Sequence, residues 1–572
     1  MKITQKSKSE RLEFFRSLYE GARYAYAEAR EKLERHLKQY RGSDEIDGGE
    51  RALTVRNVTY EIIESQVSSE IPAPKTDASY YTEERERLAH SIEALLRALR
   101  SSLPFDEQND LDERYTYIFG GSVRYVEWDS TQRRGAERGG VRIHCISPMD
   151  LTPQPNVWSI DDMEYCFLRF CSTRGEIKEK YGISDEECYR LELEGENGEL
   201  DTGDTVSMII TFWRNEEGEV SQFIFSGDVV LLDTEAYYRR KSISDESGIS
   251  DVTHELVRDR YSSGRFIKVP YYVPREFPIV IRKNTSLDGS LLGQSDCEYL
   301  RPEQQAINKL ESRILQKLLR SGVTPIVPED ASIAVNNSVF GQVIRMKPGE
   351  SMAQYGKVDT TPDVTQDIAE AERLYDHAKR ILGITDAYQG IDGRAGESGY
   401  AKQLKISQSG GRLESKRRMK NAAYARLDRL IFLHYLAFAD EVRDLTYKDQ
   451  LGRVHNERFN KYDFIVCTDD GTPVYDDSYL FSTDPDGGSE YQREALWQRN
   501  LENLRAGTLG DPTSPETLLR YWQAQQRAHY PHANDNVEYF KELVRAQLPP
   551  QSAEISARVP TDREIEETEV TE

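Results

Sequence analysis

The feature that most constrains this chain is a succession of helical patterns between Leu291 and Asp440. Two amphipathic segments of roughly 20–25 residues bracket an insert, and a glycine-rich stretch then leads into a longer helical pattern. At 1.5 Å per residue, each of the first two helices would be ~30–38 Å long. A pair of that length can lie side by side and hold the insert away from the rest of the protein. A helical hairpin buried in a globule fits the same periodicity and stays open as the alternative.

The first helix of the pair is predicted over residues 295–321, because apolar residues recur there at three- and four-residue steps and Gly322 follows. Its start has two interpretations. Pro302 suits a first helical position, where its missing N–H costs nothing. Ser295 and Glu298 instead match a capping box, which would leave Pro302 inside the helix.

The second helix is predicted over residues 362–383. Thr361 supplies a cap, Pro362 a first-turn proline and Asp363 a negative charge at the positive end of the helix dipole. Gly383 follows the last turn, as is typical of a helix end. We therefore expect a second long helix that can pair with the first.

The insert over residues 322–361 contains several prolines and alternating apolar residues, which predict short turns and strands with a small packed face. After the second helix, four glycines recur at every third position: Gly390, Gly393, Gly396 and Gly399. The run is too short and too poor in proline for collagen, and no Lys-Ser/Thr follows it as a P-loop requires. It predicts a mobile loop, followed by a helix to Asp440 that Gly410 and Gly411 bend.

The N-terminal half reads as an α+β domain. Helices are predicted at residues 8–40, 52–68 and 80–100, and a β-hairpin with its turn at Gly120 and Gly121. Alternating apolar residues predict further strands of a mostly antiparallel sheet at residues 141–145, 205–213, 221–225 and 229–232. The polar segment 240–265 predicts an exposed loop. Short strands are expected at 445–482, a boundary at 484–488 and helices at 489–546.

Composition excludes several classes of protein. The net charge of −24 argues against a general nucleic-acid binder, which would need a basic surface. No run of 18 apolar residues predicts a membrane span, and the N-terminus has no apolar run typical of a signal peptide. Six scattered cysteines favour free thiols in a reducing compartment, so we expect a soluble cytoplasmic protein.

No motif predicts an enzyme, a metal site or a cofactor. Asp161–Asp162 and Asp469–Asp470 are the best candidates for Mg²⁺ ligands of a nuclease, but adjacent aspartates at turns are more often solvated or capping. The segment His254–Arg258 lacks the second histidine of a zinc protease and reads as a charged loop. A metal-dependent DNA-processing nuclease and a non-enzymatic helical scaffold are the alternatives to the interpretation below.

Four stretches carry a family pattern: residues 278–284 (Pro-Ile-Val-Ile-Arg-Lys-Asn), 293–296 (Gly-Gln-Ser-Asp), 305–310 (Gln-Ala-Ile-Asn-Lys-Leu) and 398–403 (Ser-Gly-Tyr-Ala-Lys-Gln). In this order and spacing they resemble the portal (head–tail connector) proteins of tailed bacteriophages. The similarity extends from about residue 50 to about residue 545 and is most specific over 266–435. The charged N- and C-terminal extensions depart from the family pattern.

The resemblance implies an α+β protomer in a ring of about twelve subunits that surrounds a channel for double-stranded DNA. It divides the chain into an N-terminal charged helical extension (1–50), an α+β wing (51–294), a first stem helix (295–321), a clip (322–361), a second stem helix (362–383), a tunnel loop (384–399), a long wing helix with returning strands (400–488), a helical crown (489–546) and an acidic disordered tail (547–572).

The resemblance also implies which residues face each partner. The tunnel-loop residues toward DNA would be Thr385, Gln389, Gly390, Gly393, Arg394, Gly396, Ser398, Gly399 and Lys402. The clip residues that dock the terminase large subunit and later the head-completion or adaptor proteins would be Val339, Phe340, Val343, Arg345 and Lys347. A major capsid or scaffold protein would be a further partner. The protein would be assembled in the host bacterial cytoplasm and reside at one capsid vertex of the virion.

One charge run is open to two interpretations. Nine basic and two acidic residues lie between Lys402 and Arg429, in a chain that is strongly acidic overall. These bases would either contact DNA phosphates in the channel or face acidic surfaces of a neighbouring subunit. We expect the second arrangement, because mostly acidic channel walls suit DNA that must slide without being gripped.

Overall fold

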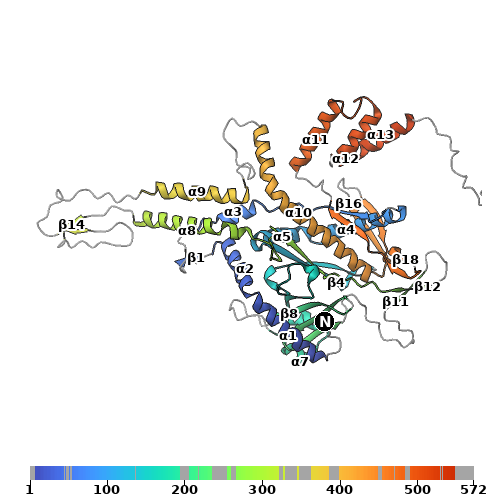
Figure 1. Cartoon of the computed structure of the whole chain (residues 1–572), viewed down its shortest axis with the longest axis horizontal. Coiled ribbons are helices and arrows are strands. Elements are labelled where there is room, and N and C mark those ends of the chain that lie inside the picture. The colour runs from blue at the N-terminus through green and yellow to red at the C-terminus, as the bar shows by residue number, and fades with distance from the viewer. Residues whose placement is uncertain are drawn as a thin grey trace, which may run out of the picture. The chain divides into compact units, whose positions relative to one another are not determined.

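The structure is a computed structural model that combines helices and strands (Figure 1). It describes residues 7–43, 45–46, 50–51, 54–80, 82–135, 137–192, 205–216, 218–234, 254–258, 266–320, 326–328, 344–346, 363–384, 399–448, 454–468, 470–483, 490–527, 530 and 533–547. The chain separates into two compact units. The larger contains Met1–Tyr447 with His455–Thr483, and the smaller contains Lys448–Val454 with Asp484–Glu572.

Two antiparallel sheets form the centre of the larger unit. The first has three strands in the order β13-β4-β5, with bounds Ile279–Lys283, Gly121–Arg134 and Glu137–Ile146. The second has five strands in the order β10-β9-β8-β7-β6, with bounds Val229–Thr234, Val220–Ser226, Thr205–Arg214, Tyr165–Thr173 and Leu151–Pro153. The predicted strands at 141–145, 205–213, 221–225 and 229–232 are confirmed.

Strand β8 shows how side-chain alternation divides the core. Met208 and Phe212 point toward the core shared with β4 and β13. Trp213 points to the opposite face, where helix α1 (Lys8–Ala25) covers the sheet. Phe15 of α1 lies 6.0 Å from the Trp213 ring and 4.9 Å from the Phe223 ring, between ring centroids. The five-stranded sheet is therefore buried on both faces.

Helix α10 (Gly399–Phe438) is the longest described element, and its C-terminal half lies in the main hydrophobic core. It packs there against α4 (Glu83–Ser102), β13 and β20 (Tyr479–Thr483). Every residue from Leu430 to Ala437 is buried, so this last part of the helix has no face toward solvent. The helix is continuous through Gly410 and Gly411, and the bend at these glycines stays a prediction.

Short strands follow α10, as the sequence predicts. They are β16 (Arg443–Lys448), β17 (Val454–Phe459), β18 (Ile465–Cys467), β19 (Pro473–Tyr475) and β20. β20 pairs antiparallel with β3 (Pro74–Ala78), which joins the end of this unit to its N-terminal part. All six cysteines are free thiols, as expected.

The predicted hairpin at Gly120 and Gly121 is wrong. The segment before the glycines is helix α5 (Phe105–Phe119), Gly120 ends it with φ of 87°, and β4 begins at Gly121. The alternation of aromatic residues at 115–119 had suggested a strand. The helical face was hidden because polar residues occupy its buried positions, including Asp112 and Glu113.

Three further expectations need correction. The helix predicted over 52–68 is only α3 (Val58–Glu64). The predicted exposed loop at 240–265 contains β11 (His254–Arg258), which pairs with β12 (Phe266–Pro270), so His254–Arg258 is a strand and not a charged loop. Its Val257 is buried, which explains the strand. Residues 235–253 and 259–265 lie outside the described residues.

The smaller unit contains the helices α11 (Glu490–Arg505), α12 (Pro515–Arg527) and α13 (Ala533–Gln547), in agreement with the helical prediction for 489–546. The rings of Trp497 and Tyr530 pack edge to face at 5.1 Å between centroids. The other short elements are α2 (Ala27–Tyr40), α6 (Arg174–Tyr181), α7 (Asp185–Tyr189), β1 (Glu45–Ile46), β2 (Glu50–Arg51), and the 3-10 helices η1 (Pro148–Asp150), η2 (Ile160–Asp162) and η4 (Lys461–Phe464).

Candidate functional site

Most residues that the sequence assigns to a site lie outside the described residues. These are Thr385, Gln389, Gly390, Gly393, Arg394, Gly396 and Ser398 of the tunnel loop, and Val339, Phe340, Val343 and Lys347 of the clip. Gly399 and Lys402 belong to the first turns of α10, so Gly399 begins a helix rather than ending a loop. Arg345 belongs to β15 (Ile344–Met346), which pairs in parallel with β14 (Ile326–Pro328). The described candidate site is therefore the set of helices that flank these segments.

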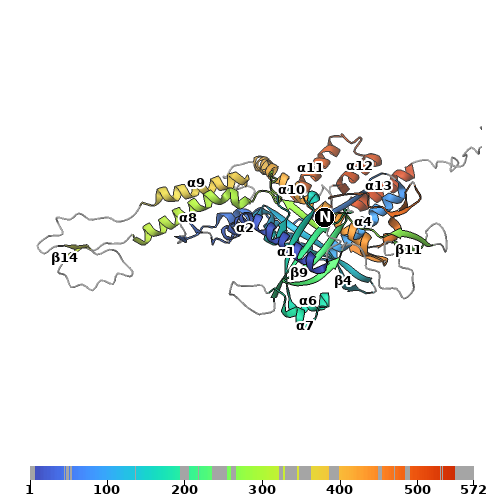
Figure 2. The same ribbon diagram turned by 60° about the horizontal axis from the view of Figure 1, so that its bottom comes forward.

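Helices α8 (Asp296–Arg320) and α9 (Thr365–Leu382) form the antiparallel pair that we call the stalk. They run side by side away from the sheets in both views (Figures 1 and 2). Ser295 Oγ accepts a hydrogen bond from the Cys297 N–H at 3.0 Å, and Pro302 lies inside α8. The start at Ser295 with Pro302 inside the helix is thus confirmed, whereas the Glu298 carboxylate of the predicted capping box contacts His36 instead. Helix α9 begins at Thr365 and not at the predicted residue 362, and Asp363 Oδ1 accepts from the Thr365 N–H at 2.9 Å.

The two ends of the stalk are held differently. Near the sheets, Leu300 and Ile307 of α8 pack with Tyr375 of α9 in a core that α3 completes. Toward the far end, the helices meet through an ion pair between Lys317 and Asp367. Exposed apolar residues cluster at this end: Leu318, Leu319 and Ile368 are 49%, 73% and 47% exposed. The far end therefore presents exposed apolar side chains, of which Leu319 is the most exposed.

Bases on α10 are paired within the same chain. Lys416 Nζ lies 2.6 Å from Asp296 at the start of α8, and Lys420 Nζ lies 2.9 Å from Glu113 of α5. Further along the helix, Arg426 pairs with Asp161 and Arg429 pairs with Glu276 at 2.8 Å. Neither interpretation of the charge run holds for these four bases, since they face acids of their own subunit. The side chains of residues 399–412 lie outside the described part.

A buried ionic cluster lies beneath Lys420. The Arg282 guanidinium of β13 donates to Asp112 at 2.9 Å and to Glu113 at 2.7 Å, and Arg124 of β4 lies 3.0 Å from Asp112. The side chains of Asp112 and Glu113 are each 1% exposed. Burial alone would raise the pKa of both carboxyls, but the neighbouring cations outweigh it and hold each pKa below its usual value. Both acids are therefore ionised inside the protein.

The sequence contains a weak signal for this cluster, which went unused. Arg282 follows the apolar run Ile279, Val280 and Ile281, and a charge that continues a buried strand needs a buried partner. Asp112 and Glu113 are the partners, but nothing in the sequence links positions 169 or 170 residues apart.

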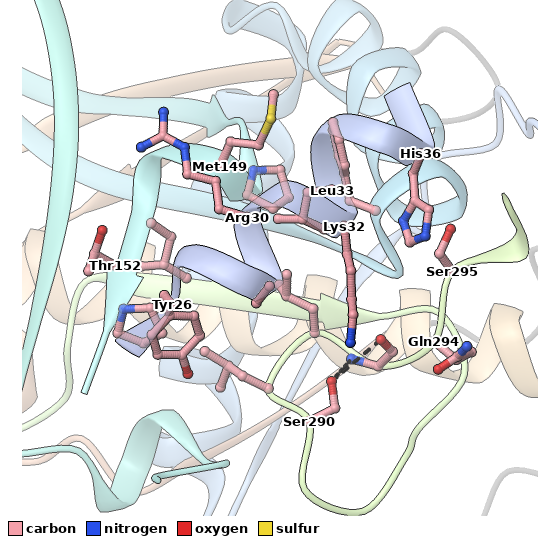
Figure 3. Close-up of a pocket in the computed structure, with 18 of the residues that line it drawn as sticks. Tyr26, Arg30, Lys32, Leu33, His36, Met149, Thr152, Ser290, Gln294 and Ser295 are labelled. Atoms are coloured by element: carbon pink, nitrogen blue, oxygen red, sulfur yellow. Dashed lines mark hydrogen bonds between the residues drawn. The ribbon is translucent and has the colours of Figure 1, made fainter. Parts of the chain in front are cut away.

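A cavity of about 360 Å³ lies between α2, residues 148–153 and the loop at 289–295. Lys32 of α2 and Tyr26, which lies between α1 and α2, reach toward the loop that carries Ser290 (Figure 3). Its size is within the range of small-ligand sites.

Three polar side chains of this cavity are already paired. Lys32 pairs with Glu28 at 3.1 Å, Arg30 with Glu34 at 3.7 Å, and His36 Nε2 donates to Glu298 at 2.7 Å. His36 Nδ1 is buried and has no hydrogen-bond partner among the described residues. Because the charged ends of Lys32, Arg30 and His36 are each directed to a different acid and do not converge on a common point, we assign the cavity no ligand.

The aspartate pair weighed as a metal site has another role. Ser159 Oγ accepts from the Asp161 N–H at 3.4 Å in a short 3-10 turn, and the Asp161 carboxylate pairs with Arg426. Asp469 lies outside the described residues. In the part of the chain that the structure describes, no group of three His, Cys, Asp or Glu side chains is placed to hold a metal ion. No described helix is long and apolar enough to cross a bilayer.

Comparison with known proteins adds no relative: neither a protein-family model nor a curated protein sequence matches this chain.

Proposed function

We propose that this chain is a portal protein of a tailed bacteriophage, about twelve copies of which form a ring around the channel for double-stranded DNA. The observation that carries the proposal is the stalk. Two antiparallel helices, α8 and α9, run away from the α+β body, and the insert 322–361 lies between them in the sequence. The 40-residue helix α10 then returns the chain to the body.

In this proposal, each segment has a role in moving DNA. The stalks stand side by side around the channel, the insert docks the terminase large subunit and later the adaptor proteins, and the residues between α9 and α10 face DNA. The α+β body contacts the capsid or scaffold protein at one vertex of the virion. The chain acts by shape and position, and catalyses no reaction itself.

The open apolar end of the stalk supports a contact between copies. Exposed leucines on a helix are energetically costly in water and are typical of surfaces that meet a partner. Leu319 is the most exposed of them, at 73%. In a ring, this face would lie against the stalk of the next subunit.

Mass photometry of the purified protein tests the proposal over a range of protein and salt concentrations. We expect closed particles of about twelve times the 65.8 kDa monomer mass, with a central hole in negative-stain images. A monomer at every concentration and salt would overturn the proposal.

A charge on the stalk locates the contact between copies. Leu319→Asp should reduce the ring fraction, because it places a carboxylate on a face that the neighbour would bury. The matched control is Leu480→Asp on β20, where the leucine is 59% exposed but lies outside the stalk. Rings that form equally well in both variants would place the contact elsewhere.

A further inference from the structure

Helix α10 carries a stripe of four polar residues at four-residue intervals. They are Lys416, Lys420, Tyr424 and Asp428, and together we call them the polar stripe. Residues four apart lie on one face of a helix, so the stripe follows three turns of α10 along one side. The four side chains are nearly buried, from 12% exposed for Lys416 to 1% for Asp428. Burying a charged side chain is costly unless an opposite charge pairs with it, so the stability of the stripe depends on the partner at each position.

The first position of the stripe contacts the base of the stalk. Lys416 Nζ donates to Asp296 at 2.6 Å and to Gln66 Oε1 at 2.9 Å. Asp296 is the first residue of α8, and its carboxylate also accepts from Asn284 at 2.8 Å and from Gln66 at 3.0 Å. The Asp296 side chain is completely buried and is therefore held by three side chains from separate parts of the chain.

The second and third positions contact α5 and β4. Lys420 pairs with Glu113 at 2.9 Å and also donates to the Ser68 carbonyl at 3.4 Å. One turn later, the Tyr424 hydroxyl accepts from Arg124 at 3.0 Å and donates to Asn109 at 3.0 Å.

The fourth position contacts α4. The Arg100 guanidinium donates to both oxygens of Asp428, at 2.7 and 2.9 Å. The Arg100 side chain is 11% exposed, so this two-point contact is nearly removed from water. The three charged positions of the stripe thus each meet an opposite charge, and Tyr424 meets a donor and an acceptor of hydrogen bonds.

The order of the charges permits only one position of α10 along its axis. A shift by one turn in one direction would bring Lys420 to the place of Tyr424, against the buried cation Arg124. A shift in the other direction would bring Phe432 to the place of Asp428 and leave Arg100 without its carboxylate. Both shifts leave a buried charge uncompensated, which an apolar stripe would not do.

We propose that the polar stripe is a rigid joint: it fixes the axial position of α10 and, through Lys416 and Asp296, ties the first turn of α8 to α10. The base of the stalk and the long helix then move together as one body. Apolar packing alone would tolerate a sliding helix, whereas these pairs do not. The joint is a property of the single chain and does not depend on the proposed ring.

Hydrogen exchange of the full-length protein tests the joint. Lys416→Met keeps the length of the side chain and removes its charge. We expect amide exchange to become about tenfold faster or more, both in the first turn of α8 and in residues 413–420 of α10, because a charged hydrogen bond is lost from both. The control is Arg418→Met, which alters a base of the same helix that is 76% exposed and pairs with Glu414 one turn away.

A double-mutant cycle shows whether Lys416 acts through Asp296. The exchange rates are measured for Lys416→Met, Asp296→Asn and the double variant. If the joint is real, the double variant exchanges little faster than the more affected single variant, since both remove the same contact. Lys416→Arg retains the charge and provides a folded comparison if Lys416→Met is poorly folded; it should keep α8 and α10 protected together.

Three outcomes would overturn the joint. The first is faster exchange in α10 with α8 unchanged, which would show that the two helices open independently. The second is additive effects in the cycle, and the third is a response of Lys416→Met no larger than that of Arg418→Met. Any of these results would reduce the contact to an ordinary local ion pair.

Discussion

Replacing Arg282 by methionine should destabilise the larger unit more than any surface substitution. The guanidinium is 3% exposed and donates to both Asp112 and Glu113. Methionine fills a similar length with apolar atoms, so the change removes the charge and its hydrogen bonds while leaving little cavity. The carboxylates of Asp112 and Glu113 then remain buried without one of the cations that neutralise them.

The expected loss in the free energy of unfolding depends on the cations that remain beside the two carboxylates. Removing one partner of a buried ion pair typically costs about 3–5 kcal/mol. Here Arg124 still lies 3.0 Å from Asp112, and Lys420 still lies 2.9 Å from Glu113. We therefore expect the lower end of that range, about 3 kcal/mol.

Urea denaturation followed by tryptophan fluorescence measures this loss. Trp497 and Trp522 belong to the smaller unit, so both are replaced by phenylalanine in all proteins compared, and the signal then reports the larger unit. With a slope of about 3 kcal/mol per M, the midpoint should fall by about 1 M. Arg458→Met is the control, since that side chain is 78% exposed and pairs with an equally exposed Asp444; it should cost under about 0.5 kcal/mol.

Acid provides a second check on the same substitution. The pKa values of Asp112 and Glu113 are lower in the folded protein than in the unfolded chain. Their stabilisation is therefore complete above about pH 4–5 and is lost as the pH falls through the folded values. The difference between the native protein and Arg282→Met should shrink on acidification below that range. A midpoint shift equal to that of Arg458→Met at neutral pH would refute the reasoning.

Two further predictions concern single positions. Gly120→Ala should lower the melting temperature more than Gly135→Ala: both glycines have positive φ, but a Cβ at 120 would lie 2.7 Å from the Gly293 carbonyl oxygen, while none of the described atoms lies within 4 Å of one at 135. Burial would raise the pKa of Glu127, but the hydrogen bond from His144 and the nearby Lys180 lower it to about 2, against 4.5 when unfolded. Glu127 should thus stabilise the fold by about 3 kcal/mol above pH 4.5, a contribution that disappears toward pH 2. Glu127→Gln should remove this part of the acid dependence in denaturation measured between pH 2 and 6.

The elements that the sequence predicts well are those with a local cause. In β8, residues 206–213 are apolar except for Ser207 and Thr211, because both sheet faces are buried by different partners. In α9, Gly383 adopts φ of 76° and ends the helix where the sequence places its end. Such patterns depend on neighbours within a few residues, so they can be read before the fold is known.

Helix α5 shows what local patterns leave out. Its buried face contains Asn109, Asp112, Glu113 and Thr116, which a hydrophobicity pattern assigns to solvent. They are buried because Arg124, Arg282 and Lys420 reach them from two strands and another helix. Neither the acidic residues of the cluster nor the basic ones, taken alone, predict that these side chains are buried. Only the fold brings the opposite charges together, so the helix was missed for the same physical reason that stabilises it.

The basic run on α10 illustrates the same limit for function. Its excess of positive charge suggests a surface that meets DNA or a neighbouring subunit, because charge is usually exposed. Yet Lys416 and Lys420 are almost fully buried, and the carboxylate that Lys416 contacts is 120 residues away in the sequence. A count of charges therefore cannot separate a binding surface from an internal joint. To distinguish the two, one must know which acidic side chains contact the helix. In this structure, acids of the same chain pair with four of its bases: Lys416, Lys420, Arg426 and Arg429. The charge of these four bases therefore serves contacts inside the chain, which a count of charges along the sequence does not reveal.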